Sequence, residues 1–201
     1  MADAALTKIV APTKTALLVM DLQPLIFQYI PDLSEYLTQT AKTIAGARSK
    51  SIPIIYVVVD FRAGYPEVST RNKQFARVLD MAQPLVSSAS AGVDPKSLVI
   101  EQLAPADTDI VVVKKRYSAF AGSDLEMVLR GIGAEDLVLA GISTSGVVLS
   151  TLRDAADRDY GLTVLEDLCL DRDDEVHRVL MQKIFPKSAD VVTSADWLAA
   201  L

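Results

Sequence analysis

Six apolar runs along the chain predict the strands of a parallel sheet. Each run is a near-continuous series of branched aliphatic residues bounded by turn-forming residues, and not an alternation of apolar and polar positions. Continuous runs of this kind are typical of strands that are buried on both faces, as in parallel sheets. The predicted strands span residues 15–21, 53–60, 109–114, 136–141, 162–167 and 189–193.

Helices are predicted between these strands, where apolar positions recur with a helical period. The pattern is clearest over residues 145–159, where Val148 and Leu152 share one face while Asp154 and Arg158 share the other. Further helices are predicted over residues 32–50, 72–82, 123–131, 173–185 and 194–201. This alternation predicts a single α/β domain over residues 1–201, with a doubly wound, mainly parallel six-stranded sheet, helices on both faces and a Rossmann-like arrangement.

The composition excludes some classes of protein. Half of the 201 residues are hydrophobic, and 20 basic against 26 acidic residues give a net charge of −6. A nucleic-acid-binding protein needs a basic face, so that class is disfavoured. No run of about 18 apolar residues predicts a membrane span, and residues 1–14 lack the pattern of a secretory signal. We therefore expect a cytoplasmic protein that binds neither nucleic acid nor membrane.

The chain contains one cysteine, Cys169, and one histidine, His177. A single cysteine cannot form an internal disulfide, and these two residues cannot build a Cys/His zinc site. We expect no metal and no cofactor. Cys169 follows the fifth predicted strand and is expected to be a small packing residue. His177 is expected on a helix surface or in a satisfied interface.

Polar residues follow the predicted strands at their carboxyl ends, where open parallel sheets bind their ligands. An acid and a base would meet there if these ends share one rim. Polar residues also end strands simply because the chain reaches water, and that interpretation competes with the functional one. The candidates are Asp21 and Gln23 after the first strand, Arg62 after the second, Lys114 and Tyr117 at the third, and residues 142–145 after the fourth.

Three stretches resemble motifs of the isochorismatase-like (cysteine hydrolase) superfamily, which includes nicotinamidases, N-carbamoylsarcosine-type amidohydrolases and isochorismatases. They are LLVMDLQ (17–23), VVVKKRYSAFAGSDLEMVLR (111–130) and LVLAGISTSGVVLSTLRDAADRDY (137–160). The resemblance extends over nearly the whole chain. It implies the fold of that superfamily, catalytic roles for Asp21 and Lys114, and a homo-oligomer, either a dimer or a tetramer.

The third stretch departs from the superfamily at the position of the nucleophile. Most members read Gly-x-x-Thr-x-x-Cys there, whereas this chain has Gly141, Thr144 and Val147. Valine cannot attack a substrate, and the amidases of the superfamily need a covalent thioester step. The chain resembles the isochorismatases here, since they also carry a non-nucleophilic residue and cleave a vinyl ether. The His ligand of the zinc-binding nicotinamidases is replaced by residues 61–62, Phe-Arg.

We therefore predict a hydrolase of a small polar or carboxylated molecule, in which Asp21 is the general acid or base and Lys114 is its charge partner. Their side chains are predicted to lie within roughly 3–4 Å of each other. Two alternatives stay open: an inactive homologue that binds a ligand or regulates, and an amide hydrolase with another nucleophile. The residues expected to contact substrate are Gln23, Phe27, Arg62, Tyr117, Ile142, Ser143, Thr144, Gly146 and Val147.

Overall fold

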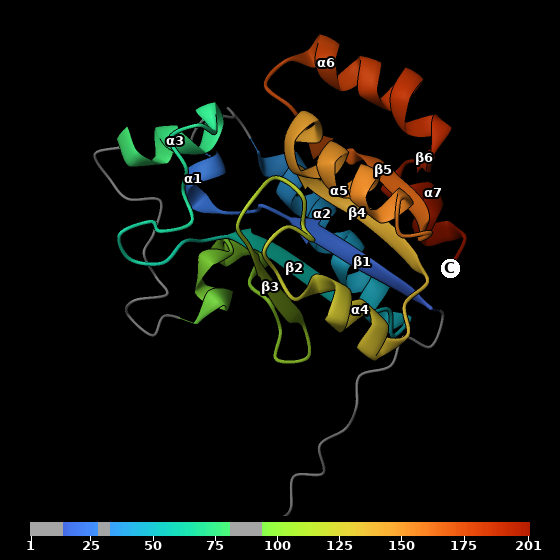
Figure 1. Cartoon of the computed structure of the whole chain (residues 1–201). Helices are drawn as coiled ribbons and strands as arrows, with labels where there is room; N and C mark the ends of the chain where they lie inside the picture. The colour runs from blue at the N-terminus through green and yellow to red at the C-terminus, as the bar shows by residue number, and fades with distance from the viewer. Residues whose placement is uncertain (1–13, 28–32, 81–93) are drawn as a thin grey trace, which may run out of the picture.

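The computed structural model describes residues 14–27, 33–80 and 94–201, which form an all-parallel six-stranded sheet (Figure 1). The strand order is β3-β2-β1-β4-β5-β6. The chain therefore winds outward from the central β1 to one edge and then crosses back to β4, which confirms the predicted doubly wound α/β class. The strands are β1 (Thr15–Met20), β2 (Ile54–Val59), β3 (Ile110–Lys114), β4 (Asp136–Ile142), β5 (Gly161–Leu170) and β6 (Asp190–Val192).

Both faces of the sheet are buried, which explains why the strands read as continuous apolar runs. Successive side chains of β1 point into two separate cores, because side chains alternate along a strand. Leu18 and Met20 belong to the first core, whereas Leu17 and Val19 belong to the second. The central strand therefore presents no face to solvent.

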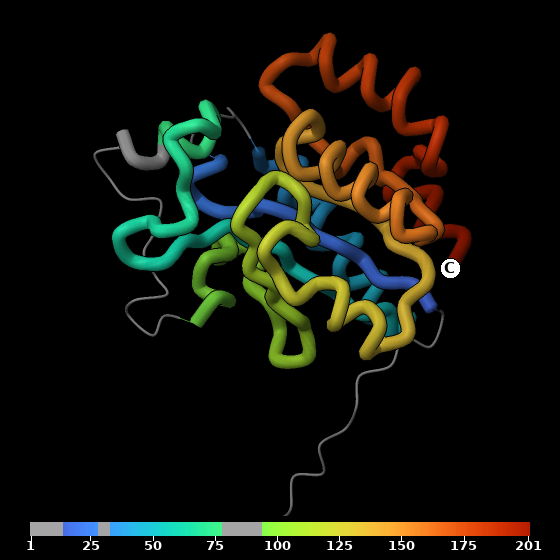
Figure 2. Tube along the Cα trace, in the orientation of Figure 1, coloured from blue at the N-terminus to red at the C-terminus, as the bar shows by residue number. Residues whose placement is uncertain are grey.

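Helical segments cover the sheet in two layers, as the ribbon and the tube both show (Figures 1 and 2). In chain order they are α1 (Pro24–Phe27), α2 (Ser34–Ser49), α3 (Lys73–Asp80), η2 (Pro95–Leu98), η3 (Glu101–Leu103), α4 (Leu125–Ile132), η4 (Thr144–Val148), α5 (Leu149–Ala156), α6 (Asp174–Val179), η5 (Leu180–Ile184), η6 (Phe185–Lys187) and α7 (Ser194–Ala199). α4, α5, η5 and η6 pack on the first core. α2, η2, η3 and α7 pack on the second. None of the helices in the described ranges is long and apolar enough to cross a membrane.

The predicted helices are present, with differences at their ends. The helix predicted over 145–159 divides into η4 and α5, and the one predicted over 173–185 continues from α6 through η5 and η6. The segments α1, η2 and η3 were not predicted, because they are too short to show a helical period. Residues 1–13, 32 and 81–82, on which some predictions fall, lie outside the described residues.

β5 is longer than predicted, because its pairing with β4 shifts partway along. Leu139 pairs with Val164, but Gly141 pairs with Cys169. The polar residues at 166–167 suggested that the strand had ended, whereas the chain rejoins the sheet after them. Cys169 therefore lies inside β5 and not after it. It is 1% exposed, in agreement with the predicted packing role.

Gly141 is required where β4 passes close to the end of β1. Its φ is +152°, and a Cβ atom there would lie 2.5 Å from the carbonyl oxygen of Met20. A glycine tolerates this backbone conformation and leaves room for the neighbouring strand. Because Met20 directly precedes Asp21, the close approach fixes the strand end that carries a candidate catalytic residue.

We predict that Gly141→Ala lowers the free energy of unfolding by about 2 kcal/mol or more, because overpacking alone costs roughly 1–3 kcal/mol and the unfavourable φ adds to it. Gly131→Ala is the matched control. Gly131 lies within α4 with no atom within 4 Å of its Cβ position, so alanine should be neutral or stabilising there. Urea unfolding followed by circular dichroism measures both variants. Wild-type stability in Gly141→Ala would contradict the described packing of β1 against β4.

Candidate active site

A cavity of about 540 Å³ opens at the carboxyl end of the sheet, a size suited to a small molecule. It is lined by residues that follow or end β1, β2, β3, β4 and β5, together with residues of α1 and α3. This is the end of the sheet at which the sequence predicts the site. The predicted residues that line the cavity are Asp21, Lys114, Tyr117, Ile142, Ser143, Gly146 and Val147.

Asp21 and Lys114 form a buried ion pair in this cavity. Lys114 Nζ lies 2.9 Å from Asp21 Oδ2, and the two side chains are 3% and 9% exposed, respectively. β1 and β3 lie on either side of β2, so the pair meets over the end of β2. The predicted contact distance is confirmed, and the positions of the strands explain how residues 93 positions apart come together.

One oxygen of the Asp21 carboxylate is left without a partner among the described residues. Oδ2 contacts Lys114, whereas Oδ1 is buried and makes no hydrogen bond. Burial raises the pKa of Asp21, and the adjacent ammonium of Lys114 opposes that rise. Because the pKa lies above its ordinary value, this carboxyl holds a proton at a higher pH than an exposed aspartate does, as general acid catalysis requires.

The Lys114 ammonium is shared between Asp21 and the backbone. Its Nζ donates a hydrogen bond to the carbonyl oxygen of Arg116 at 3.0 Å. Of the three donors on an ammonium group, two are thus engaged within the protein. Lys114 is therefore better placed to control the charge state of Asp21 than to bind a carboxylate of the substrate.

The turn after β4 places Val147 in the cavity wall. The peptide bond that precedes Ser143 is cis, and the carbonyl oxygen of Ser143 accepts hydrogen bonds from the N–H groups of Gly146 and Val148, each at 3.2 Å. Val147 is 2% exposed, belongs to the first core and is among the residues that line the cavity. The position that most members of the superfamily fill with cysteine therefore borders the cavity and holds no nucleophile.

Two predicted substrate contacts, Gln23 and Arg62, are engaged outside the cavity. The Gln23 amide accepts from the N–H of Val59 at 2.7 Å and donates to the carbonyl oxygen of the same residue at 3.1 Å. It thereby joins the end of β1 to the end of β2. Arg62 forms an exposed ion pair with Glu67 at 2.5 Å. Neither side chain is among those that line the cavity.

Phe27 and Thr144 also lie outside the residues that line the cavity. The Phe27 ring packs beside Tyr36 of α2, with ring centroids 6.4 Å apart. The Thr144 hydroxyl is hydrogen-bonded to Nδ1 of His177 at 2.9 Å. His177 therefore connects α6 to the turn after β4, and its predicted place in a satisfied interface agrees with this contact.

α3 and the end of β5 contribute cavity residues that were not predicted from the sequence. Asp171 and Arg172 follow β5 directly and line the cavity. Polar residues at the carboxyl ends of predicted strands are the site candidates in the sequence. Asp171 and Arg172 escape this rule because β5 was predicted to end at residue 167. Asp171 Oδ2 accepts from the N–H of Ser145 at 2.7 Å, which ties the end of β5 to the turn after β4. Arg77 lines the cavity from α3, which lies within the helix predicted over residues 72–82, but the sequence did not indicate that this helix borders the site.

Aromatic side chains form part of the cavity wall. Phe75 of α3 lies edge-on to Phe61 and Tyr117, with ring centroids 6.0 and 5.2 Å away. All three residues line the cavity, as do the aliphatic Ile26 and Val147. The cavity therefore offers a large apolar surface next to a small charged centre, an arrangement typical of small-molecule sites.

Cys169 does not replace the missing nucleophile. Burial raises the pKa of its thiol to about 12, and its Sγ lies in the core, 4.0 Å from the carbonyl oxygen of Leu139. It does not line the cavity. As far as the described residues extend, no group of three or more His, Cys, Asp or Glu side chains is arranged to hold a metal ion.

The all-parallel sheet thus carries a cavity with a buried ion pair at its carboxyl end, and comparison with known proteins identifies the family. The family model described as the isochorismatase domain matches residues 15–196. The chain therefore belongs to the isochorismatase family, whose members are hydrolases, and the resemblance seen in the sequence is confirmed.

Individual relatives cover most of the chain. YecD of Escherichia coli O157:H7, an uncharacterized isochorismatase family protein, is 32% identical over 192 residues, which cover 93% of this chain and 96% of YecD. The ureidoacrylate amidohydrolase RutB of Acinetobacter baylyi is 31% identical over 194 residues, covering 87% and 78% of the two chains. A solved isochorismatase family protein of Burkholderia thailandensis is 27% identical with a TM-score of 0.78, covering 97% of this chain and 99% of that chain.

We predict that Val147→Cys creates a thiol that reacts under native conditions. The wild-type protein should be inert to a thiol reagent, because Cys169 is buried and its pKa is about 12. The introduced thiol would line the same cavity as Lys114 and should be modified to about one equivalent. Intact-protein mass measures the stoichiometry.

Val148→Cys is the matched control for this experiment. Val148 is 0% exposed and does not line the cavity, so a thiol there should stay unmodified. Equal inertness of the two variants would show that position 147 does not face the cavity and that the alignment of the motif is wrong.

Proposed function

We propose that this chain is a hydrolase that cleaves a small carboxylated molecule by acid–base chemistry, with Asp21 as the acid and Lys114 as its charge partner. One observation carries the proposal. The Asp21 carboxyl lies in the cavity, has a buried oxygen that no described residue binds, and contacts a buried ammonium. Because Val147 occupies the nucleophile position in the same cavity, the attacking group in this proposal is water.

A vinyl ether is the substrate chemistry that this arrangement supports best. The protonated Asp21 carboxyl gives its proton to the terminal carbon of the enol ether. The π electrons of the double bond form the new C–H bond, and the carbon that bears the ether oxygen becomes an oxocarbenium ion. Water adds to the cationic carbon and returns a proton to Asp21, and the resulting hemiketal breaks down to a ketone and an alcohol. Lys114 stabilises the Asp21 carboxylate between the two proton transfers.

Arg77 is the residue that we assign to the substrate carboxylate. None of the ion pairs between described residues involves Arg77, whereas Lys114 is engaged by Asp21. Arg77 also opposes the rise that burial causes in the pKa of Tyr117, so the two side chains are close. A guanidinium binds a carboxylate through two hydrogen bonds. Cations outnumber carboxylates among the charged residues that line the cavity, which are Asp21, Asp171, Lys114, Arg77 and Arg172.

Amide hydrolysis is the second candidate, because RutB of Acinetobacter baylyi is an amidohydrolase and is 31% identical to this chain. Ser143 and Ser145 line the cavity, and one of their hydroxyls would have to act in place of the cysteine. Asp171 contacts the backbone N–H of Ser145 and not its hydroxyl. That carboxylate is therefore not placed as the base for such a nucleophile, and the vinyl ether stays the first candidate.

We further propose that the chain works as a homo-oligomer, a dimer or a tetramer, in the cytoplasm. Family membership supports self-association, since the resemblance of the sequence implies it. The net charge of −6 supports a small-molecule partner in preference to nucleic acid.

We predict that Asp21→Asn lowers kcat/KM for a carboxylated vinyl ether by roughly 10²–10⁴-fold, because an amide cannot donate the proton. Val147→Ala should keep most of the rate, since valine only shapes the wall. In the wild type, kcat/KM should fall as the pH rises through the raised pKa of Asp21, because the acid has to be protonated to act. Release of the ketone product across a panel of vinyl ethers measures these rates.

A parallel panel of amides separates the alternatives. An amide hydrolase would form a covalent adduct visible by mass, and would lose turnover in Ser143→Ala or Ser145→Ala. A ligand-binding homologue would turn over neither panel, whereas its affinity for the bound molecule would change in Asp21→Asn. Either result would overturn the acid–base proposal.

We predict that Arg77→Met raises the KM of a carboxylated substrate by about tenfold or more with little change in kcat, since a hydrogen bond to a charged group contributes about 1.5–3 kcal/mol. The KM of the matching methyl ester should not change. Arg62→Met is the matched control, because Arg62 pairs with Glu67 and does not line the cavity. An unchanged KM for the carboxylate in Arg77→Met would show that the anion binds elsewhere.

A further inference from the structure

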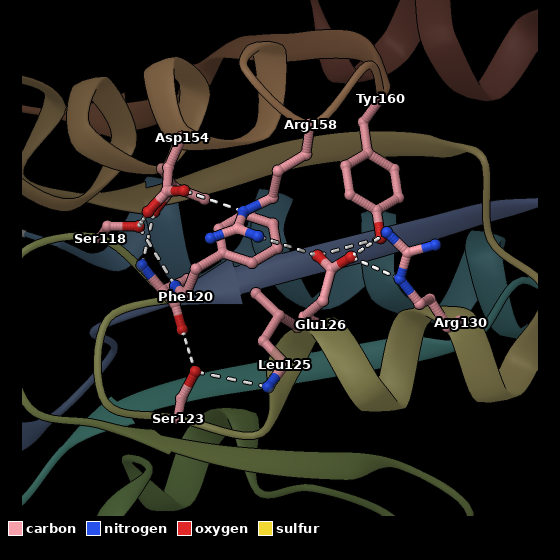
Figure 3. A network of polar contacts seen from close by, with 11 residues as sticks. Ser118, Phe120, Ser123, Leu125, Glu126, Arg130, Asp154, Arg158 and Tyr160 are labelled. Atoms are coloured by element: carbon pink, nitrogen blue, oxygen red, sulfur yellow. Dashed lines mark hydrogen bonds and ion pairs between the residues drawn. The ribbon is translucent and has the colours of Figure 1, made fainter.

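The loop between β3 and α4, residues 115–124, is held by α5 (Figure 3). The N–H of Ala119 donates to Thr151 Oγ1 at 2.9 Å, and both residues are 0% exposed. Ser118 Oγ donates to Asp154 Oδ2 at 2.7 Å. We refer to these four residues, Ser118, Ala119, Thr151 and Asp154, as the clamp.

Neighbouring side chains fix Asp154 in place. Its Oδ1 accepts from Arg158 Nε at 2.9 Å, and the Arg158 guanidinium lies 4.8 Å from the centre of the Phe120 ring. Arg158 also pairs with Glu126 of α4 at 3.7 Å. Figure 3 shows these contacts as one network that joins the loop, α5 and α4. The acceptor for Ser118 is therefore a partly exposed carboxylate that is also paired with Arg158.

The clamp is connected to the catalytic pair through the loop backbone. Lys114 Nζ donates to the carbonyl oxygen of Arg116, which lies two residues before Ser118. On the α5 side, Thr151 follows Val147 by four residues, about one helical turn. The clamp thus joins the part of the site that carries the ammonium to the part that carries Val147.

The contacts on the opposite side of the loop are of a different kind. Lys115 Nζ donates to the carbonyl oxygen of Asp60, and the Arg116 guanidinium donates to that of Glu67, each at 2.6 Å. Both contacts come from long side chains, which can follow a movement of the main chain. Thr151 instead binds the loop backbone itself, in a place without access to water.

We propose that Thr151 and Asp154 are positioning residues, which hold the loop so that the Lys114 ammonium stays bound to both Asp21 and the carbonyl oxygen of Arg116. Neither residue lines the cavity. This inference rests on the proposed function only for the roles of Asp21 and Lys114. The inference adds a second role for α5, which directly follows the segment that contains Val147. Through the loop, α5 would also control the charge state of Asp21.

Release of the clamp should weaken the attraction between Lys114 and Asp21, because Coulomb energy falls with distance. The Asp21 carboxylate would then be less stable, and its pKa would rise further. The other charged groups that face Asp21 across the cavity are Arg77 of α3 and the Asp171–Arg172 pair after β5. Arg77 lies close to Tyr117 of the same loop, and Asp171 binds the N–H of Ser145 before α5. The charge that acts on the pKa of Asp21 is nevertheless that of Lys114.

Thr151→Val tests the inference in the full chain, because it keeps the shape of the side chain and removes the hydrogen-bond acceptor. The infrared band of the protonated carboxyl reports the titration of Asp21, isolated as the difference from the same protein carrying Asp21→Asn. We expect the midpoint in Thr151→Val to rise by about half a pH unit or more, a part of the roughly 1–3 units that an adjacent cation contributes. Thr151→Ser should restore the wild-type midpoint.

Thr43→Val is the matched control. Thr43 is 0% exposed, and its hydroxyl donates to the carbonyl oxygen of Gln39 in α2, which packs on the second core. The Thr43→Val variant should be less stable than the wild type, but its Asp21 carboxyl should titrate with the same midpoint. If Thr151→Val does not fold, Ser118→Ala provides the same test, with a smaller expected rise because Ser118 is less deeply buried.

An unchanged Asp21 midpoint in a folded variant would overturn the inference and leave the clamp a structural feature. So would an equal shift in Thr43→Val, which would indicate a general loosening. The titration does not require turnover. If the midpoint moves as expected but no vinyl ether is hydrolysed, the clamp is supported and the proposed function alone fails.

Discussion

The buried contact between Asp21 and Lys114 is the interaction on which the rest of this site depends. Two charges taken out of water are unfavourable unless they pair closely and find further hydrogen bonds. Here the ammonium binds the carboxylate and the carbonyl oxygen of Arg116, while Gln23 closes the gap between the ends of β1 and β2. One oxygen of Asp21 still has no partner among the described residues. A buried acceptor of this kind opposes folding, and a catalytic proton transfer gives a physical reason for it.

The parallel sheet decides which other residues can surround that pair. All strand ends of one polarity meet at the same edge, and the reversal of winding between β1 and β4 leaves an opening there. The shifted register of β5 then carries the chain far enough for Asp171 to bind the N–H of Ser145. The turn that presents Val147 is thus held from β5, and α5 holds the loop that follows Lys114.

The replacement of a cysteine by Val147 changes what the remaining groups can do. A thiol could bond to a substrate, whereas methyl groups can only exclude water and shape the wall. The Asp21 carboxyl, with its pKa raised by burial, is then the group in the cavity best suited to transfer a proton at mild pH. The aromatic wall and the guanidinium of Arg77 place an apolar surface and a positive charge in the same cavity.

By itself, the sequence determined the strands and their parallel arrangement, because apolar runs are local features. Strand-end positions offered several polar candidates, and the resemblance to the superfamily selected Asp21 and Lys114 among them. The sequence could not distinguish Arg77 from Arg62, since one guanidinium lines the cavity and the other pairs with Glu67. Nor could it locate the true end of β5, because that end depends on pairing with β4. Only the tertiary structure decided these points. Where a side chain points, and what it binds, depends on partners that are distant in the chain and meet only when the sheet has formed.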